Sequence, residues 1–228
     1  MHIRLLLVLS LIIQCSCSSA PNKEQRAFAR KKVGSSAHDI VSAGRYDKLM
    51  VEIQYIRGYR IEDTSIARLL SYLTTLCHKP DGIEIDQSVI YPTMPTDTLT
   101  IDQVLAIELK HRKYYSSGHT LAIYVLITNG YASTYMIAGR AYNNTSIVVY
   151  GKTISVSFFG DNQQLFVLQH EFGHLMGLVN CGTTMQAPHE DSVHKNHCTN
   201  KGCVMNYGSG STVLDSSCLR DLRAIGAK

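Results

Sequence analysis

The segment that most constrains this chain is "LQHEFGHLMGL", which runs from Leu168 to Leu178. Its two histidines, His170 and His174, are four residues apart, a spacing that places both side chains on one face of an α-helix. Gly177 tolerates the positive φ at which a helix can stop and the chain can turn away. We therefore expect a helix over residues 162–178 that presents two imidazoles to one point.

Glu171 lies next to the first of these histidines, and two imidazoles with a neighbouring carboxylate are typical of a catalytic zinc site. In such a site the glutamate takes a proton from the attacking water and passes it to the leaving amine. The alternative is an amphipathic helix in which both histidines face solvent. Its core would then consist of apolar neighbours of the histidines: Phe172, Leu175, Met176 and Leu178.

The residues directly after this helix do not supply an obvious third ligand for such a zinc ion. Asn180 stands three residues after Gly177, and a neutral amide is a poor zinc ligand. Further along, the chain reads "HCTNKGCVM" from His197 to Met205. With the helix segment, this resembles the archaemetzincin family of metzincin zinc peptidases, whose motif is His-Glu-x-x-His-x-x-Gly-x-x-His-Cys-x-x-x-x-Cys-x-Met. The resemblance places an insertion after Val179, and it implies that His197 is the third ligand and Met205 the Met-turn residue beneath the metal.

Other residues of the same loop remain candidates for the third ligand. His189 and His194 are imidazoles, and Asp191 is a carboxylate that could bind zinc; Asn180 itself is the fourth rival. Each could equally be a solvated loop residue or an outer partner that orients a ligand ring.

Tyr207 follows Met205 by two residues, like a tyrosine that follows the Met-turn in astacin-like metzincins. That resemblance implies that its hydroxyl steadies the oxyanion of the reaction. The alternative is a tyrosine that only packs in a loop.

The cysteines give a second metal hypothesis. The family resemblance implies a second zinc ion held by four cysteines in two pairs. Cys198, Cys203 and Cys218 match three of them, but Asp221 stands where the second member of the last pair belongs. Cys181 could complete the set. Alternatively, Cys198 and Cys203 form a disulfide, which we favour because export favours disulfides.

The N-terminus indicates export. Residues 1–19 have a positive start and then an apolar run too short to span a bilayer, as in a signal peptide. The following "QCSCSS" resembles a bacterial lipoprotein box, with Cys15 or Cys17 carrying the lipid, so we expect a cell-envelope protein anchored to the membrane only there. The alternative is plain cleavage near Ser19 or Ala20 with no lipid, which would give a secreted or periplasmic protein. Residues 20–45 are polar and are expected to form a tether or short pro-segment. The formal net charge of +4 is too weak to indicate nucleic-acid binding.

Residues 46–228 are expected to form one catalytic domain. Alternating elements come first and antiparallel strands later, which indicates an α+β, zincin-like fold with a mixed twisted sheet and packed helices. The histidine helix should form the floor of a cleft above a small irregular C-terminal subdomain. Before that helix we expect strands at 48–56, 81–90, 119–130 and two within 133–151, and helices at 62–77 and 98–115.

The sequence thus predicts a zinc-dependent endopeptidase that acts on peptides or proteins, with Glu171 as the general base. The alternative is a non-catalytic surface lipoprotein whose zinc site is closed by a fourth protein ligand such as His189 or Asp191. A latent enzyme, with Cys77 or the loop covering the metal, is a third hypothesis.

Overall fold

The computed structural model describes residues 20–92, 97–133, 137–155 and 162–228. At its centre is a five-stranded sheet in the order β2-β1-β4-β7-β6. The strands pair in parallel except β6, which is antiparallel to β7 at one edge of the sheet. In chain order the bounds are Lys48–Ile56 for β1, Ile83–Ile90 for β2, Thr120–Thr128 for β4, Gly139–Asn143 for β6 and Ser146–Tyr150 for β7.

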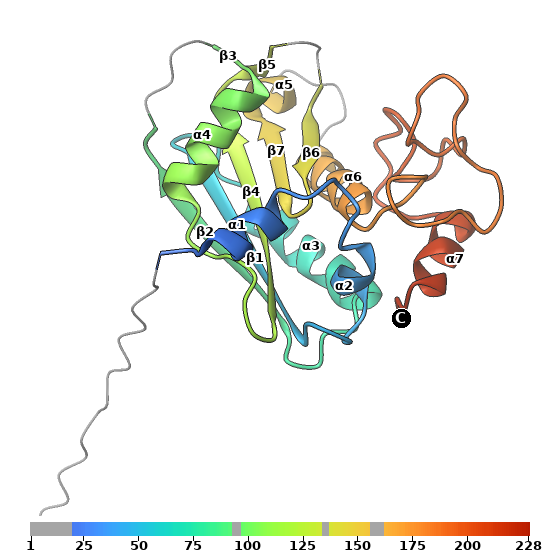
Figure 1. The fold of residues 1–228 in the computed structure, drawn as a ribbon. Coiled ribbons are helices and arrows are strands. Elements are labelled where there is room, and N and C mark those ends of the chain that lie inside the picture. The colour runs from blue at the N-terminus through green and yellow to red at the C-terminus, as the bar shows by residue number, and fades with distance from the viewer. Residues whose placement is uncertain (1–19, 93–96, 134–136, 156–161) are drawn as a thin grey trace, which may run out of the picture.

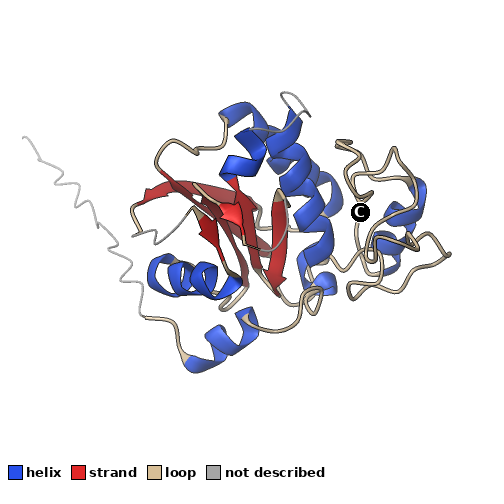
Figure 2. Ribbon diagram, turned by 90° about the horizontal axis from the view of Figure 1, so that it is seen from above, coloured by secondary structure: helices blue, strands red, loops and turns tan. Residues whose placement is uncertain are grey.

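Helices cover both faces of this sheet (Figures 1 and 2). On one face lie α3 (Asp63–Leu76) and α6 (Gln163–Leu175), which pack against each other. On the other face lies α4 (Ile101–His111). The alternation of β4 explains both cores, because Ile123 and Val125 face the first layer while Tyr124 and Leu126 face the second. The expected mixed sheet with packed helices is therefore confirmed.

The ends of the helices follow local rules only in part. Thr100 caps α4 in a capping box with Gln103, a pattern typical of helix starts. Helix α3 begins after Glu62, which makes no side-chain cap hydrogen bond. Two short strands, β3 (Thr98–Leu99) and β5 (Tyr131–Ala132), form a separate parallel pair, and α5 spans Gly151–Ser155.

The segment 20–45 differs from an extended tether, because it packs on the domain. It contains α1 (Lys23–Ala29) and α2 (Ala37–Val41), and the side chains of Ile40 and Val41 are fully buried. Two contacts fix it in place. Lys79 Nζ donates to backbone oxygens of Asp39, Ser42 and Tyr46 at 2.5–2.7 Å. The Asn144 amide donates to Phe28 O and Ser36 Oγ. The polar composition of this segment suggested a tether, but its few apolar residues lie at positions that are buried against the domain.

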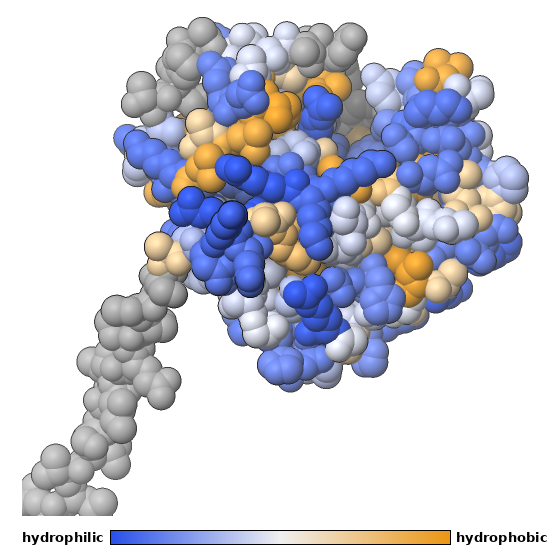
Figure 3. All heavy atoms as spheres, viewed as in Figure 1, coloured by the Kyte–Doolittle hydropathy of each residue, from blue (hydrophilic) through white to orange (hydrophobic). Residues whose placement is uncertain are grey.

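After α6 the chain forms the irregular C-terminal part, drawn in orange and red in Figure 1. Residues 176–215 are turns and loops, and α7 (Ser216–Ala224) follows them. Helix α6 lies between this part and the sheet. The leader at 1–19 is outside the described residues. Within the described part, no helix is both long and apolar enough to cross a membrane. The face seen in Figure 3 is mainly hydrophilic, with apolar side chains gathered over α4, where Leu109 is 45% exposed.

Candidate metal centre

The two histidines of α6 face each other at one point. The Nε2 atoms of His170 and His174 are 3.2 Å apart. Two nitrogen ligands about 2.0–2.1 Å from one tetrahedral ion would be separated by about 3.3 Å. The separation between the rings is therefore the one that a shared zinc ion requires.

His197 completes this group from the C-terminal part. Ligand nitrogens of the three histidines lie within 4.8 Å of one another. The His197 ring centroid is 5.1 Å from that of His170 and 5.3 Å from that of His174. Among the residues that the structure describes, no other histidine, cysteine, aspartate or glutamate joins this group.

The loop between the helix and His197 closes on itself, which explains how a distant residue reaches the site. Val179 and Asn180 have positive φ values of 51° and 63° and turn the chain out of the helix. At the far end, the Asn196 amide donates to Val179 O at 3.2 Å. The two ends of the loop therefore meet at Val179, and His197 follows directly after this contact.

The rivals for the third ligand lie elsewhere. The Asn180 amide donates to Glu190, and the Asp191 carboxylate accepts from the backbone N–H groups of Val193 and His194. His189 is buried against Cys218, with its Nε2 3.6 Å from the cysteine sulfur.

The surroundings of the three rings keep their coordinating nitrogens unprotonated. The Nδ1 atom of His170 lies 2.7 Å from Val204 O, and that of His197 lies 2.8 Å from Lys195 O. A carbonyl oxygen can only accept a hydrogen bond, so each Nδ1 carries the hydrogen and each Nε2 is free to bind a metal. Burial lowers the pKa of His170 to about 4 and lowers the pKa values of His174 and His197. The donor set therefore fits a zinc ion.

Glu171 lies beside this group, on the side of the sheet edge. One of its carboxylate oxygens accepts from the Ala141 N–H of β6 at 2.7 Å, and only 6% of the residue is exposed. Burial raises its pKa to about 8, against the lowering effects of the Ala141 hydrogen bond and of Arg140. A Cβ at Gly139 would come within 2.6 Å of Val167 and 3.0 Å of Glu171. Glycine at this position thus lets the strand approach the helix.

Met205 packs beneath the histidines. It is fully buried, and a Cβ added at Gly173 would lie 2.2 Å from its sulfur. Gly173 stands between the two histidine ligands in the sequence, so the absence of a side chain there lets the methionine reach the helix backbone. We did not anticipate this need for glycine from the sequence, although a glycine in a helix interior is itself a signal of close packing.

Tyr207 stands at the rim of the site and is 54% exposed. Its ring meets the His197 ring edge to face, with 5.3 Å between centroids. On its other side, His194 stacks on it in parallel, with the centroids 4.2 Å apart. Tyr207 is therefore in contact with His197, the candidate third ligand, and with the loop residue His194.

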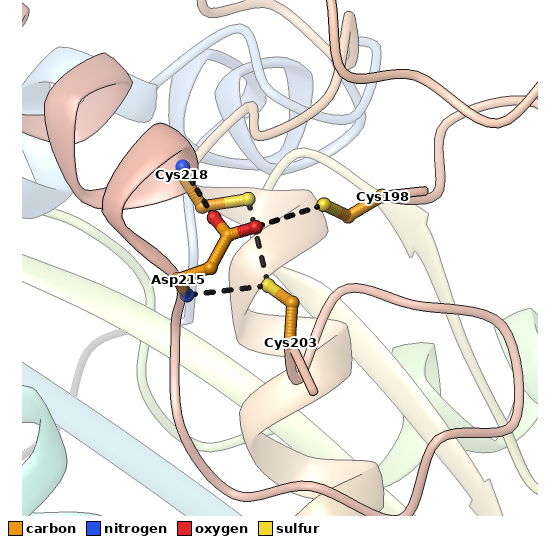
Figure 4. A group of neighbouring side chains, drawn as sticks. All are labelled: Cys198, Cys203, Asp215 and Cys218. Carbon is orange, nitrogen blue, oxygen red and sulfur yellow. Dashed lines mark hydrogen bonds between the residues drawn. The ribbon is translucent and has the colours of Figure 1, made fainter. Parts of the chain in front are cut away.

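A second cluster lies close by and contains the cysteines. Ligand atoms of Cys198, Cys203, Asp215 and Cys218 lie within 4.8 Å of one another (Figure 4). All three thiols are free, so the expected disulfide between Cys198 and Cys203 is wrong in this structure. The sulfur atoms of Cys203 and Cys218 are 3.7 Å apart, which is beyond bonding distance.

Two other expectations about the cysteines are also corrected. The Cys181 sulfur does not complete the thiol cluster, because it lies 3.5 Å from His174 Nδ1 in the histidine site. Cys77 is 1% exposed within the main hydrophobic core and is absent from both groups of metal-binding side chains.

The arrangement of a mixed sheet, a histidine helix and a third histidine from an irregular C-terminal part is that of a zincin-like fold. No family model matches the sequence, and the search of curated proteins finds no match either. The crystal structure of archaemetzincin from Methanopyrus kandleri is similar, with a TM-score of 0.54 and 15% sequence identity, over 79% of this chain and 97% of that one. At this identity the likeness shows the fold, which is archaemetzincin-like.

Proposed function

We propose that this protein is a zinc-dependent endopeptidase in which His170, His174 and His197 bind the ion. The observation that carries the proposal is the meeting of three largely buried imidazoles beside a buried carboxylate. The fold likeness to an archaemetzincin supports the same class of chemistry.

The number of ligands supports catalysis over a purely structural role. Structural zinc sites use four protein ligands, whereas catalytic sites use three and leave one position open. Only three histidines meet here within the described part of the chain, and His189 and Asp191 are held by other partners. A closed, non-catalytic site is therefore the less favoured alternative.

When bound, Zn²⁺ would acidify a water molecule and polarise the carbonyl of the scissile peptide bond. Glu171 is placed to accept the proton of the attacking water, because its second carboxylate oxygen is free of the Ala141 hydrogen bond. Glu171 then donates that proton to the leaving amine. Tyr207 at the rim donates its hydroxyl hydrogen to the developing oxyanion.

The substrate would be an extended peptide at the edge of the sheet. Strand β6 is an edge strand, and no other described strand pairs with its outer side. An extended peptide can add to such an edge by main-chain hydrogen bonds. The backbone of β6 also contacts Glu171, so a peptide bound there lies beside the proposed base.

The test compares the wild-type protein with Glu171→Gln in zinc content and in cleavage of a mixed library of quenched fluorescent peptides. We expect both proteins to carry zinc at the histidine site and the variant to cleave about 10²–10⁴-fold more slowly. Equal cleavage by both proteins, or a histidine site that binds no zinc, would refute the proposal. His174→Ala is the control that should lose both the metal and the activity.

We also propose that the protein is exported and held at the cell envelope by a lipid on Cys15 or Cys17. The supporting features are the short apolar run and the two cysteines that follow it. Changing both cysteines to serine should move the protein from the membrane fraction to the soluble fraction after expression in a bacterium. Retention in the membrane fraction would contradict the lipid anchor.

A further inference from the structure

Two helices from distant parts of the sequence lie side by side on the outside of the molecule. Arg26 and Arg30 of the α1 segment line a surface depression together with Leu105, Leu109 and Tyr115 from α4 and the residues after it. Figure 3 shows strongly hydrophilic side chains beside the apolar side chains over α4. Positive charge and exposed apolar surface therefore adjoin on this side of the protein.

The positive charge runs along one side of α1. Lys23, Arg26 and Arg30 follow one another at steps of three and four residues, a spacing that places their side chains on one side of a helix. All three are exposed, and within the described part of the chain no ion pair neutralises any of them. The two lysines after Arg30 are also exposed, and Glu24 is the one acidic residue between positions 20 and 36.

The apolar part comes from the outer side of α4. Leu105 and Leu109 are four residues apart and so share one side of that helix. Leu109 is 45% exposed, and Leu105 and Tyr115 are half-buried. The acidic Asp102 lies in the first turn of α4, at the end away from α1. Leucine and tyrosine beside basic side chains are the composition of a surface that lies in the headgroup region of a bilayer.

The segment that carries the basic side chains is fixed to the domain. Ala29 is buried, the side-chain amide of Asn144 donates to Phe28 O at 3.2 Å, and the backbone N–H of Asn144 donates to Lys31 O at 2.9 Å. The charges therefore project from an ordered backbone. A surface that is already formed loses little conformational freedom when a partner binds.

We propose that this surface rests on an anionic phospholipid bilayer. We call it the α1–α4 face and define it by Lys23, Arg26, Arg30, Leu105, Leu109 and Tyr115. The basic side chains attract phosphate headgroups, while the leucine and tyrosine side chains enter the boundary between the headgroups and the acyl chains.

The inference builds on the proposed lipid anchor, which would place α1 close to a bilayer. The chain from Cys17 to Lys23 can span at most about 20 Å when fully extended. A lipid on Cys15 or Cys17 would thus keep the α1–α4 face within reach of the membrane surface. This proximity favours a bilayer over other partners of negative charge.

Two other occupants fit this face less well. A second copy of the chain would bring two positive surfaces together, and like charges across an interface repel. A nucleic acid would match the basic side chains but would leave the exposed leucines without a partner, and the net charge of +4 is weak for such binding.

The sheet separates the α1–α4 face from the histidine site. Helix α4 packs on one face of the sheet and α6 on the other, and the C-terminal part lies beyond α6 (Figure 2). A bilayer under α1 and α4 would therefore leave the histidine site directed away from the lipid. Peptides in the surrounding medium could reach the site without crossing the membrane surface.

The experiment uses the full chain with Cys15→Ser and Cys17→Ser, so that no lipid chain is attached. Binding is measured by sedimentation with vesicles of phosphatidylcholine alone and of an equal mixture of phosphatidylcholine and phosphatidylglycerol. We expect stronger binding to the anionic vesicles, and we expect added salt to weaken it. The pair Arg26→Gln and Arg30→Gln should weaken this binding by about tenfold or more. Leu109→Gln should weaken it by about threefold or more.

The matched control is the pair Arg220→Gln and Arg223→Gln, which removes the same charge from exposed positions of α7. We expect this control to bind like the unmodified background. The leader is the same in every protein, so a difference between proteins reports the changed residues. Circular dichroism checks that each variant is folded.

Equal binding to neutral and anionic vesicles would overturn the proposal. An equal loss for the α1 pair and the α7 pair would also overturn it, because net charge alone would then explain the binding. If light scattering showed a dimer that Leu109→Gln dissolves, a second copy would occupy the face and the bilayer would be the wrong partner.

This test is separate from the tests of the proposed function. Vesicle binding requires neither zinc nor peptide cleavage, so an inactive protein would not affect it. The contact is released by salt, so a protein without the lipid should still leave a membrane fraction that has been washed with salt. Failure of the lipid anchor and failure of the α1–α4 face are therefore distinguishable.

Discussion

At the scale of single residues, the histidine site depends on a position where a side chain is absent. Gly173 lies between the two helix histidines, and the Met205 sulfur occupies the space that a Cβ would take, at 2.2 Å. A glycine in a helix interior costs about 1 kcal/mol relative to alanine. The close contact between Met205 and the helix backbone explains why a glycine is present despite this cost.

Gly173→Ala should therefore destabilise the protein, even though alanine favours helices. We expect the free energy of unfolding to fall by about 1–3 kcal/mol, because Met205 must move out of a packed core. Urea unfolding followed by circular dichroism measures this change. Gly44→Ala is the matched control, since a Cβ there meets no atom closer than 3.6 Å. An unchanged or increased stability of Gly173→Ala would show that the methionine moves freely.

Tyr207→Phe should slow peptide cleavage without loss of zinc. Phenylalanine keeps the ring between His194 and His197, so only the hydroxyl is removed. Loss of one oxyanion donor typically lowers kcat by about 10²–10³-fold. Steady-state kinetics on a cleaved peptide would measure this, with KM expected to change little. A wild-type kcat would assign Tyr207 to packing alone.

At the scale of the elements, the sequence predicted those whose pattern is local. The apolar alternation of 48–56 matches β1 at both ends, and the helical spacing within 98–115 predicts α4, which is shorter and spans Ile101–His111. Helices α1, α2 and α7 were missed because each is too short to show a clear helical periodicity in the sequence. The site divides in the same way. The helix spacing brings His170 and His174 together, whereas the position of His197 depends on how a long loop folds back.

One buried cation makes a large contribution to the docking of the N-terminal segment. Lys79 is 6% exposed, and its ammonium group donates to three backbone oxygens between residues 39 and 46. Gly34, in the same segment, packs against the backbone that follows the histidine helix. A Cβ at Gly34 would lie 1.8 Å from Cys181 O. The segment therefore supports the turn that leaves α6.

Lys79→Met should lower the free energy of unfolding by about 2–4 kcal/mol, because three buried carbonyl groups lose a charged donor. Residues 20–45 should also exchange their amide hydrogens faster. Hydrogen exchange with mass spectrometry would measure both the extent and the location of the effect. Lys110→Met on the exposed side of α4 is the control and should change neither quantity. Unchanged protection in 20–45 would mean that the segment docks without this lysine.

At the scale of the whole molecule, the two halves are stabilised differently. The sheet and its helices contain most of the buried apolar residues. Residues 176–215 have almost no regular secondary structure, and their buried apolar side chains are fewer: Met176, Leu178, Val179, Cys198, Cys203, Val204, Met205 and Leu214. Such a region lacks the continuous hydrogen-bond ladders of helices and strands and is held by isolated turn contacts, so bound metal should contribute to its local stability.

Removing metal with a chelator under reducing conditions should therefore loosen the C-terminal half first. Protease cleavage and amide exchange should increase between residues 180 and 215, while strands β1 and β4 keep their protection. Added Zn²⁺ should reverse the change in wild type. If chelation exposed both halves equally, the fold would behave as one cooperative unit. If chelation exposed neither half, the loops would be stable without metal, and a bound ion would not be needed to hold His197 near the helix.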